Sequence, residues 1–231
     1  DPEKNRDKVG EMLKEVPKLT QKIAGKSIPL EKFVSRKARK FHLQDRRLFF
    51  PWLEILYIFN GFDTIPSATV TEHLAAIDAA LSKLESSGSA TSDHLPYATY
   101  ADDVCLARFL KGVLIREEAY PHAQTLMPVE ELARLPVPEA RVEERLSYAA
   151  RQLEFVISQA HDIKLDHWIL PFARFELGQL YMRSRAYPKA RREYEAALNG
   201  GVAEDEAGSA KKKASLENML HFRAHNALVK L

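Results

Sequence analysis

The chain has 231 residues, of which 45% are hydrophobic and 29% are charged, and it contains one cysteine. A single cysteine excludes an internal disulfide and a cysteine-based zinc cage, and this hydrophobic fraction can bury a substantial core. The formal net charge of +2 divides into +7 over residues 1–50, −9 over 51–209 and +4 over 210–231. Basic ends could contact an anionic partner, although solvated helix faces would produce the same distribution.

The longest apolar stretch indicates that the chain does not cross a membrane. It runs from Phe49 to Phe59, is interrupted by Pro51 and Glu54, and falls short of the roughly 20 apolar residues that a spanning helix needs. The chain opens on Asp1 without a basic and apolar leader, so we expect a soluble fragment or processed product of a longer protein.

Apolar residues recur at helical spacing almost throughout the chain, and strand-like alternation never extends beyond a few residues. Pro29, Pro66 and Pro188 fit first-turn positions of helices, and the pair Asn60-Gly61 favours a helix end because both residues tolerate a left-handed backbone. Mostly short loops predict consecutive helical hairpins. The expected helices span about 7–24, 29–42, 50–61, 66–86, 97–117, 121–134, 139–161, 167–183, 187–198 and 210–229.

A basic cluster lies on the second expected helix and just after it. Phe33 and Phe41 belong to an apolar stripe on the same segment, so an amphipathic helix is predicted. Such a helix can bind an anionic lipid surface through residues 33–47, or it can bury its stripe in the core. We favour core packing and keep the lipid surface as the alternative; no nucleic-acid partner is expected. The candidate cations are Arg36, Lys37, Lys40, Arg46 and Arg47.

Two carboxylates, Glu54 and Glu176, lie inside otherwise apolar helices. Buried carboxylates with a raised pKa are typical of general acids, but no second catalytic group is placed beside either one. A hydrogen bond between helices, or a pair with an arginine, is the better interpretation. The chain also lacks nucleotide-binding and nucleophile motifs, so neither enzymatic activity nor a cofactor is expected.

The cysteine and a histidine pair give no metal site. Cys105 lies in an apolar stretch, which predicts a buried structural thiol. His221 and His225 are four residues apart on an expected helix, but the glutamate of a metalloprotease is missing between them. We therefore predict a packed or solvated pair of histidines and no metal.

Residues 171–199 carry most of a tetratricopeptide repeat. Leu177-Gly178-x2-Tyr181 and Ala190-x3-Tyr194 match its spacing, whereas Arg174 stands in the place of the usual Trp. The small residues allow two helices to approach closely and the aromatic residues fill the space between layers. The pattern predicts an all-α, right-handed α-α superhelix, with residues 1–231 forming one helical-repeat domain.

In repeat scaffolds of this kind the first helix of each pair lines the concave face, where a partner peptide would lie. The alternative is that Phe172 and Phe175 pack against the long helix before them. The Lys/Asn carboxylate clamp of chaperone-binding repeats is absent, which disfavours the acidic C-terminus of a chaperone. The candidates for partner binding are Phe172, Phe175, Gln179, Met182 and Arg183.

Four stretches together resemble one family. They are FVSRKARKF from Phe33, PWLEILYIFNGF from Pro51, HWILPFARFELGQLYMRSRAYPKAR from His167, and LENMLHFRAHNALVKL from Leu216. In this order they are similar to the C-terminal half of the fungal inclusion body clearance proteins, which are related to animal tetratricopeptide repeat protein 39.

The resemblance implies a non-enzymatic adaptor that acts in lipid-droplet-linked clearance of protein inclusions after folding stress. The implied partners are lipid-droplet proteins or aggregated and misfolded clients, with peripheral association with a membrane or droplet and no transmembrane segment. The implied location is the cytoplasm, at lipid droplets or inclusion bodies, with the nucleus as a further option. No catalytic residue is implied.

Overall fold

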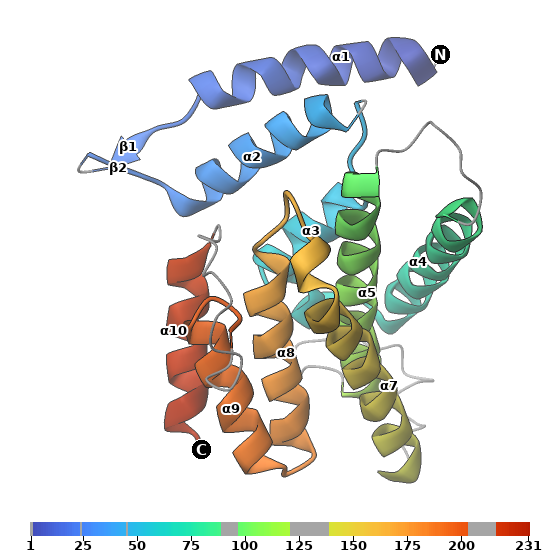
Figure 1. Cartoon of the computed structure of the whole chain (residues 1–231), viewed down its shortest axis with the longest axis vertical. Helices are drawn as coiled ribbons and strands as arrows, with labels where there is room; N and C mark the ends of the chain where they lie inside the picture. The colour runs from blue at the N-terminus through green and yellow to red at the C-terminus, as the bar shows by residue number, and fades with distance from the viewer. Residues whose placement is uncertain (1, 24, 45, 89–96, 121–138, 203–215) are drawn as a thin grey trace.

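The structure is a computed structural model of the chain, and it describes residues 2–23, 25–44, 46–88, 97–120, 139–202 and 216–231 (Figure 1). These residues form an all-α helical-repeat fold, as predicted. Short 3-10 turns lie at Val16–Lys18 (η1), Gly61–Thr64 (η2) and Ala160–Asp162 (η3). The helices are α1 (Pro2–Glu15), α2 (Pro29–Leu43), α3 (Pro51–Ile58), α4 (Ser67–Gly88), α5 (Tyr97–Ala119), α7 (Glu139–Ser158), α8 (Ile169–Arg183), α9 (Tyr187–Leu198) and α10 (Glu217–Val229).

Helices α4 to α10 pack each against the next described helix in the chain, as expected for consecutive hairpins. The hairpin of α1 and α2 lies across one end of this stack (Figure 1). The helix expected at 121–134 and the first residues of the one expected at 210–229 lie outside the described residues. The right-handed sense of the superhelix and the single domain over residues 1–231 stay predictions.

The first helix was placed wrongly. It was expected at 7–24, but α1 ends at Glu15. Pro17, which has no amide hydrogen to continue the helix, lies in η1. The chain then forms a short antiparallel pair of strands, β1 (Lys22–Ile23) and β2 (Lys26–Ser27), in which Lys22 lies opposite Ser27. Gly25 turns between the strands with a φ of +75°, a conformation that glycine adopts without strain.

Helix α8 lies at the centre of the core. Its residues from Pro171 to Gly178 are all buried, and an aromatic cluster joins its start to α3 and α5. The Trp168 ring lies 5.4 Å from Phe172, 5.5 Å from Phe109 and 6.2 Å from Tyr57 between ring centroids. The first two contacts are edge-to-face and the third is stacked. Such contacts add to the burial of apolar area, so α8 has little freedom to move against α3 and α5.

The repeat at 171–199 shows the close approach that its sequence predicted. A Cβ atom on Gly178 would lie 2.6 Å from Cε1 of Tyr194, so only glycine allows α8 and α9 this contact. At the position of the usual Trp, Arg174 is buried and its Nη1 donates to Glu193 at 3.0 Å. An ion pair between helices therefore replaces an aromatic contact there.

Candidate functional site

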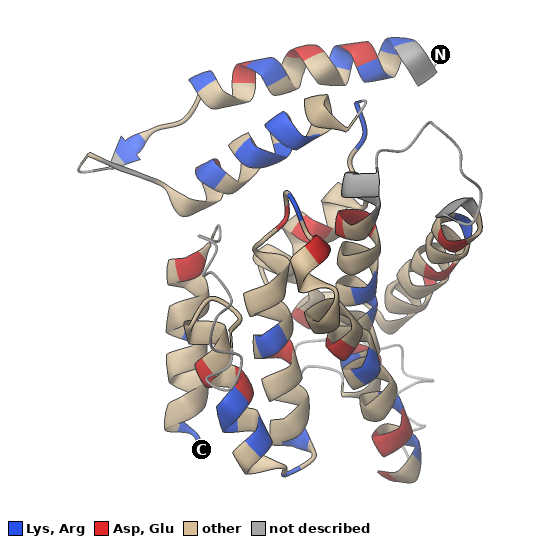
Figure 2. Cartoon of the chain, in the orientation of Figure 1, with Lys and Arg blue, Asp and Glu red and all other residues tan. Residues whose placement is uncertain are grey.

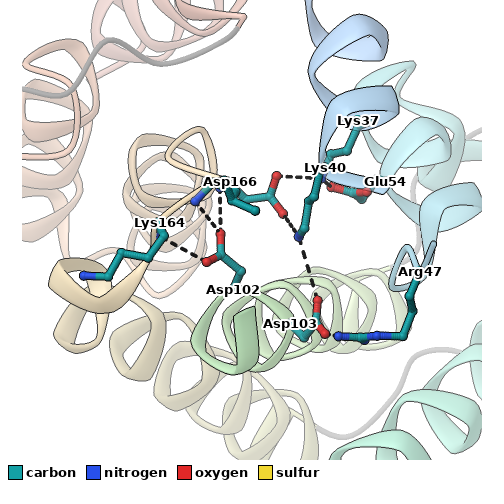
Figure 3. A network of polar contacts seen from close by, with 9 residues as sticks. Lys37, Lys40, Arg47, Glu54, Asp102, Asp103, Lys164 and Asp166 are labelled. Carbon is teal, nitrogen blue, oxygen red and sulfur yellow. Dashed lines mark hydrogen bonds and ion pairs between the residues drawn. The ribbon is translucent and has the colours of Figure 1, made fainter. Parts of the chain in front are cut away.

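Two polar arrangements stand out among the described residues, an ionic cluster under α2 and a groove beside α8. Figure 2 shows the cations of α2 and the acidic residues at the ends of the helices that face it. The ionic cluster consists of Lys37, Lys40, Arg47, Glu54, Asp103 and Asp166 (Figure 3).

The ionic cluster joins α2 to three other segments. Lys37 pairs with Glu54 of α3, and its Nζ lies 2.7 Å from Oδ1 of Asp166, in the loop before α8. Lys40 pairs with the other oxygen of Asp166, and its Nζ lies 3.8 Å from Oδ1 of Asp103 in α5. Since each buried charge has a partner of opposite sign, their mutual attraction offsets part of the cost of removing these groups from water.

The pKa values in the ionic cluster follow from burial and neighbouring charge. Burial alone would lower the pKa of Lys40, but the charges of Asp166 and Asp103 outweigh it and the pKa is raised. For Asp166, burial is outweighed by Lys37 and Lys40, which hold its pKa below the ordinary value. Burial raises the pKa of Glu54 to about 7 against the opposing charge of Lys37. Lys40 therefore stays charged and serves as a structural cation.

This arrangement favours the predicted core packing and contradicts the alternative in which Lys37 and Lys40 present an anion-binding surface. Both lysines are buried, with 8% and 3% of their surface exposed, and their ammonium groups face carboxylates of the protein. Arg47 is half-buried and pairs with Asp103, and the exposed Arg46 pairs with Asp7. Arg36 is exposed. The amphipathic stripe is thus core, because Phe33 and Phe41 are buried along with the two lysines.

The groove lies between α8, α10 and η2. It has a volume of about 280 Å³. Its walls include Phe175, Gln179, Met182, Phe222, Arg223 and Lys230. Phe175 is buried at its base, while 72% of Phe222 is exposed at its edge. The groove therefore combines buried and exposed apolar side chains with polar groups, a combination that suits recognition of another molecule.

A series of buried polar contacts stabilises the base of the groove. The Tyr57 hydroxyl donates to Oε1 of Glu176 at 2.6 Å, and Arg116 pairs with Oε2 of the same carboxylate. Burial, and then the charge of Glu176, raise the pKa of Tyr57 well above its ordinary value, so the phenol remains a donor. This confirms the prediction that Glu176 pairs with an arginine from another helix.

The five candidates for partner binding occupy different environments. Phe175, Gln179 and Met182 line the groove, whereas Phe172 is 2% exposed and packs in the aromatic cluster. Phe172 is therefore not available to a partner, which corrects that part of the expectation. Arg183 is exposed at the end of α8, and its guanidinium lies 4.6 Å from the centre of the Tyr120 ring.

The remaining candidates are Cys105 and the histidine pair. Cys105 is 1% exposed, which confirms the predicted buried thiol, and burial raises its pKa to about 12. The rings of His221 and His225 lie 6.4 Å apart. Among the described residues, no group of three or more His, Cys, Asp or Glu side chains is placed to hold a metal ion. Within the same residues, every helix is too short or too polar to span a membrane.

The comparisons with known proteins identify the family. The family described as Iml2/Tetratricopeptide repeat protein 39 matches residues 1–118, from α1 to α5. The chain belongs to this family. It is 29% identical over 207 residues to tetratricopeptide repeat protein ttc-39B of Caenorhabditis elegans, a match that covers 90% of this chain and 28% of that protein. No solved structure matches the chain significantly.

Two parts of the structure were not predicted from the sequence. The first is the role of Asp102, Asp103 and Asp166 under α2; the neighbouring pair Asp102-Asp103 in an apolar helix was a usable signal. The second is the contribution of α10 to the groove. Arg223 and Lys230 line it, but the sequence of α10 alone does not show which helix it packs against.

Proposed function

We propose that this protein is a non-enzymatic adaptor that holds a segment of a partner protein in the groove between α8 and α10. The observation that carries this proposal is the groove itself, in which Phe175, Gln179 and Met182 of the tetratricopeptide repeat line an open space of about 280 Å³. In a stack where most apolar side chains are used for packing, half-buried Met182 and exposed Phe222 remain available to a partner.

The buried carboxylates support an adaptor over an enzyme. Glu54 is occupied by Lys37, and Glu176 by Tyr57 and Arg116. A general acid or base must reach its substrate within hydrogen-bond distance, whereas both carboxylates are 2% exposed or less and hold helices together. Their unusual environment therefore has a structural explanation.

The cellular role that we propose is lipid-droplet-linked clearance of protein inclusions after folding stress, in the cytoplasm. The family membership and the resemblance to inclusion body clearance proteins support it. Partners would be droplet proteins or aggregated clients. Because the chain spans 28% of the curated relative that it matches, we assign to it the partner-binding part of this role. The buried positions of Lys37 and Lys40 favour protein binding over the alternative of direct lipid binding.

The experiment is a clearance assay in cells with the full-length protein. Phe222→Glu places a charge at the exposed rim of the groove without entering the core. Tyr187→Glu is the matched control, since Tyr187 is an aromatic residue on α9 with 50% of its surface exposed. We expect the Phe222 variant to delay removal of a heat-aggregated reporter and the Tyr187 variant to behave like the unchanged protein. Equal clearance by all three proteins would count against the groove.

A further inference from the structure

Helix α10 gives the groove two cations on one side. Arg223 and Lys230 are seven residues apart and both line the groove. At a rise of about 1.5 Å per residue, their backbones are separated by about 10 Å along the helix. Asn226 lies between them on the same wall, where its amide can donate to and accept from the backbone of a bound segment.

Arg223 is held in place by aromatic rings. Its guanidinium carbon lies 5.9 Å from the centre of the Tyr57 ring and 5.9 Å from that of Phe175. Cation–π contacts position the guanidinium and leave its N–H groups able to bind an acceptor. Among the ion pairs of the described residues, none includes Arg223 or Lys230.

The carboxylates of the groove are fewer than its cations. Asp63 and Glu176 face Arg116, Arg223 and Lys230 across the same space. Glu176 is already paired with Arg116, so it does not balance the charge of α10. The rim therefore carries an excess of positive charge, which favours an acidic partner.

The spacing of the two cations indicates the shape of that partner. An extended segment covers about 10 Å with three residues, which matches the separation of Arg223 and Lys230 along α10. Met182 and Phe222 line the same groove, and their apolar surface can receive one bulky side chain.

We propose that the groove takes an extended acidic protein segment with two carboxylates three residues apart and a bulky apolar side chain between them. One carboxylate binds Arg223, the other binds Lys230, and the apolar side chain packs against Met182 and Phe222. This inference rests on the proposed adaptor function and names the chemistry of the partner.

The test uses the full-length protein and an N-acetylated, C-amidated fluorescent peptide. The peptide has glutamates three residues apart with a phenylalanine between them, and a matched peptide has glutamines instead. Fluorescence anisotropy should show binding of the glutamate peptide. We expect the double variant Arg223→Glu/Lys230→Glu to weaken it about tenfold or more, and added salt to weaken it as well. Arg39→Glu, at an exposed position of α2, should leave it unchanged.

The single variant Lys230→Glu controls for a loss of binding caused by misfolding of the double variant. Lys230 is exposed after the last turn of α10, so its substitution leaves the core intact. Equal binding of both peptides would overturn the acidic partner but leave the groove as a binding surface, and thus the proposed function. Loss of affinity in Arg39→Glu equal to that in Lys230→Glu would overturn the assignment to α10. If neither peptide binds, the proposed acidic segment is wrong. The clearance assay with Phe222→Glu tests the adaptor function independently.

Discussion

Asp102 and Asp103 are neighbours in α5, and their carboxylates stabilise two different segments of the chain. Asp102 accepts backbone N–H groups from Lys164 and Leu165, both at 2.9 Å, and from Asp166 at 2.7 Å. Asp103 faces the other way and pairs with cations of α2 and of the loop after it. Asp102 thereby positions the residue whose own carboxylate binds α2, so two adjacent residues fix the α1–α2 hairpin and the loop before α8 together (Figure 3).

Replacing Asp102 tests the first half of this arrangement. Asp102→Ala leaves three backbone donors without their acceptor, and we expect the free energy of unfolding to fall by about 2–4 kcal/mol. Asp102→Asn keeps one carbonyl oxygen and should cost about half as much. Urea denaturation followed by circular dichroism measures both. Equal losses for the two variants would show that the hydrogen bonds to the loop are not the cause.

Replacing Lys40 tests the second half. Lys40→Met removes one of the two buried ammonium groups that face Asp166, and a buried carboxylate that loses a partner costs about 3–5 kcal/mol. Arg39→Met, at the neighbouring exposed position, should change stability by about 0.5 kcal/mol or less. Thermal and urea unfolding of both variants provide the comparison. A loss for Lys40→Met as small as that for Arg39→Met would mean that Lys40 is not a structural cation.

The pKa of Glu54 predicts a pH dependence of stability with a definite sign. Burial raises this pKa from an ordinary value of 4.5 to about 7. Between these values the folded chain holds a proton that the unfolded chain releases, so the free energy of unfolding falls as pH rises through this window. Each unit of raised pKa corresponds to about 1.4 kcal/mol.

Glu54→Gln isolates this effect because glutamine does not titrate. We expect the stability of the unchanged protein, measured relative to the variant, to decline from about pH 4.5 to pH 7 and to level off above that range. Urea denaturation at half-unit intervals of pH measures the difference. A relative stability that stays constant or increases with pH would contradict the raised pKa.

The sequence predicted local features well and long-range pairing poorly. Asn60 has the expected left-handed backbone, with a φ of 56°, just after α3. Periodicity alone, however, assigned the cations of α2 to a polar face. Lys37 and Lys40 turn inward because Asp166, 129 and 126 residues away, supplies a buried partner for both. Such a partner is invisible in the local pattern. The groove has the same origin, since its α10 wall depends on how α10 packs beside α8 and α9.

The contact between Gly178 and Tyr194 gives the sharpest test of the tetratricopeptide repeat. Gly178→Ala would place a Cβ atom 2.6 Å from Cε1 and 2.7 Å from Cδ1 of Tyr194, so the helices must separate or the ring must move. Forcing an extra methyl group into a packed interface costs about 1–3 kcal/mol. Alanine otherwise favours a helix over glycine by about 1 kcal/mol, which opposes the cost of the clash. Any net loss of stability is therefore a lower limit for that cost.

A double-mutant cycle separates the clash from other effects of the added methyl group. Tyr194→Leu removes the ring and its hydrogen bond to Gln179, which has a length of 2.8 Å, and destabilises the protein by itself. In this background Gly178→Ala should become neutral or stabilising, because the atoms that it would meet are gone. The coupling energy from urea denaturation should therefore be about 1 kcal/mol or more. A coupling near zero would mean that the closeness of α8 and α9 does not depend on this pair.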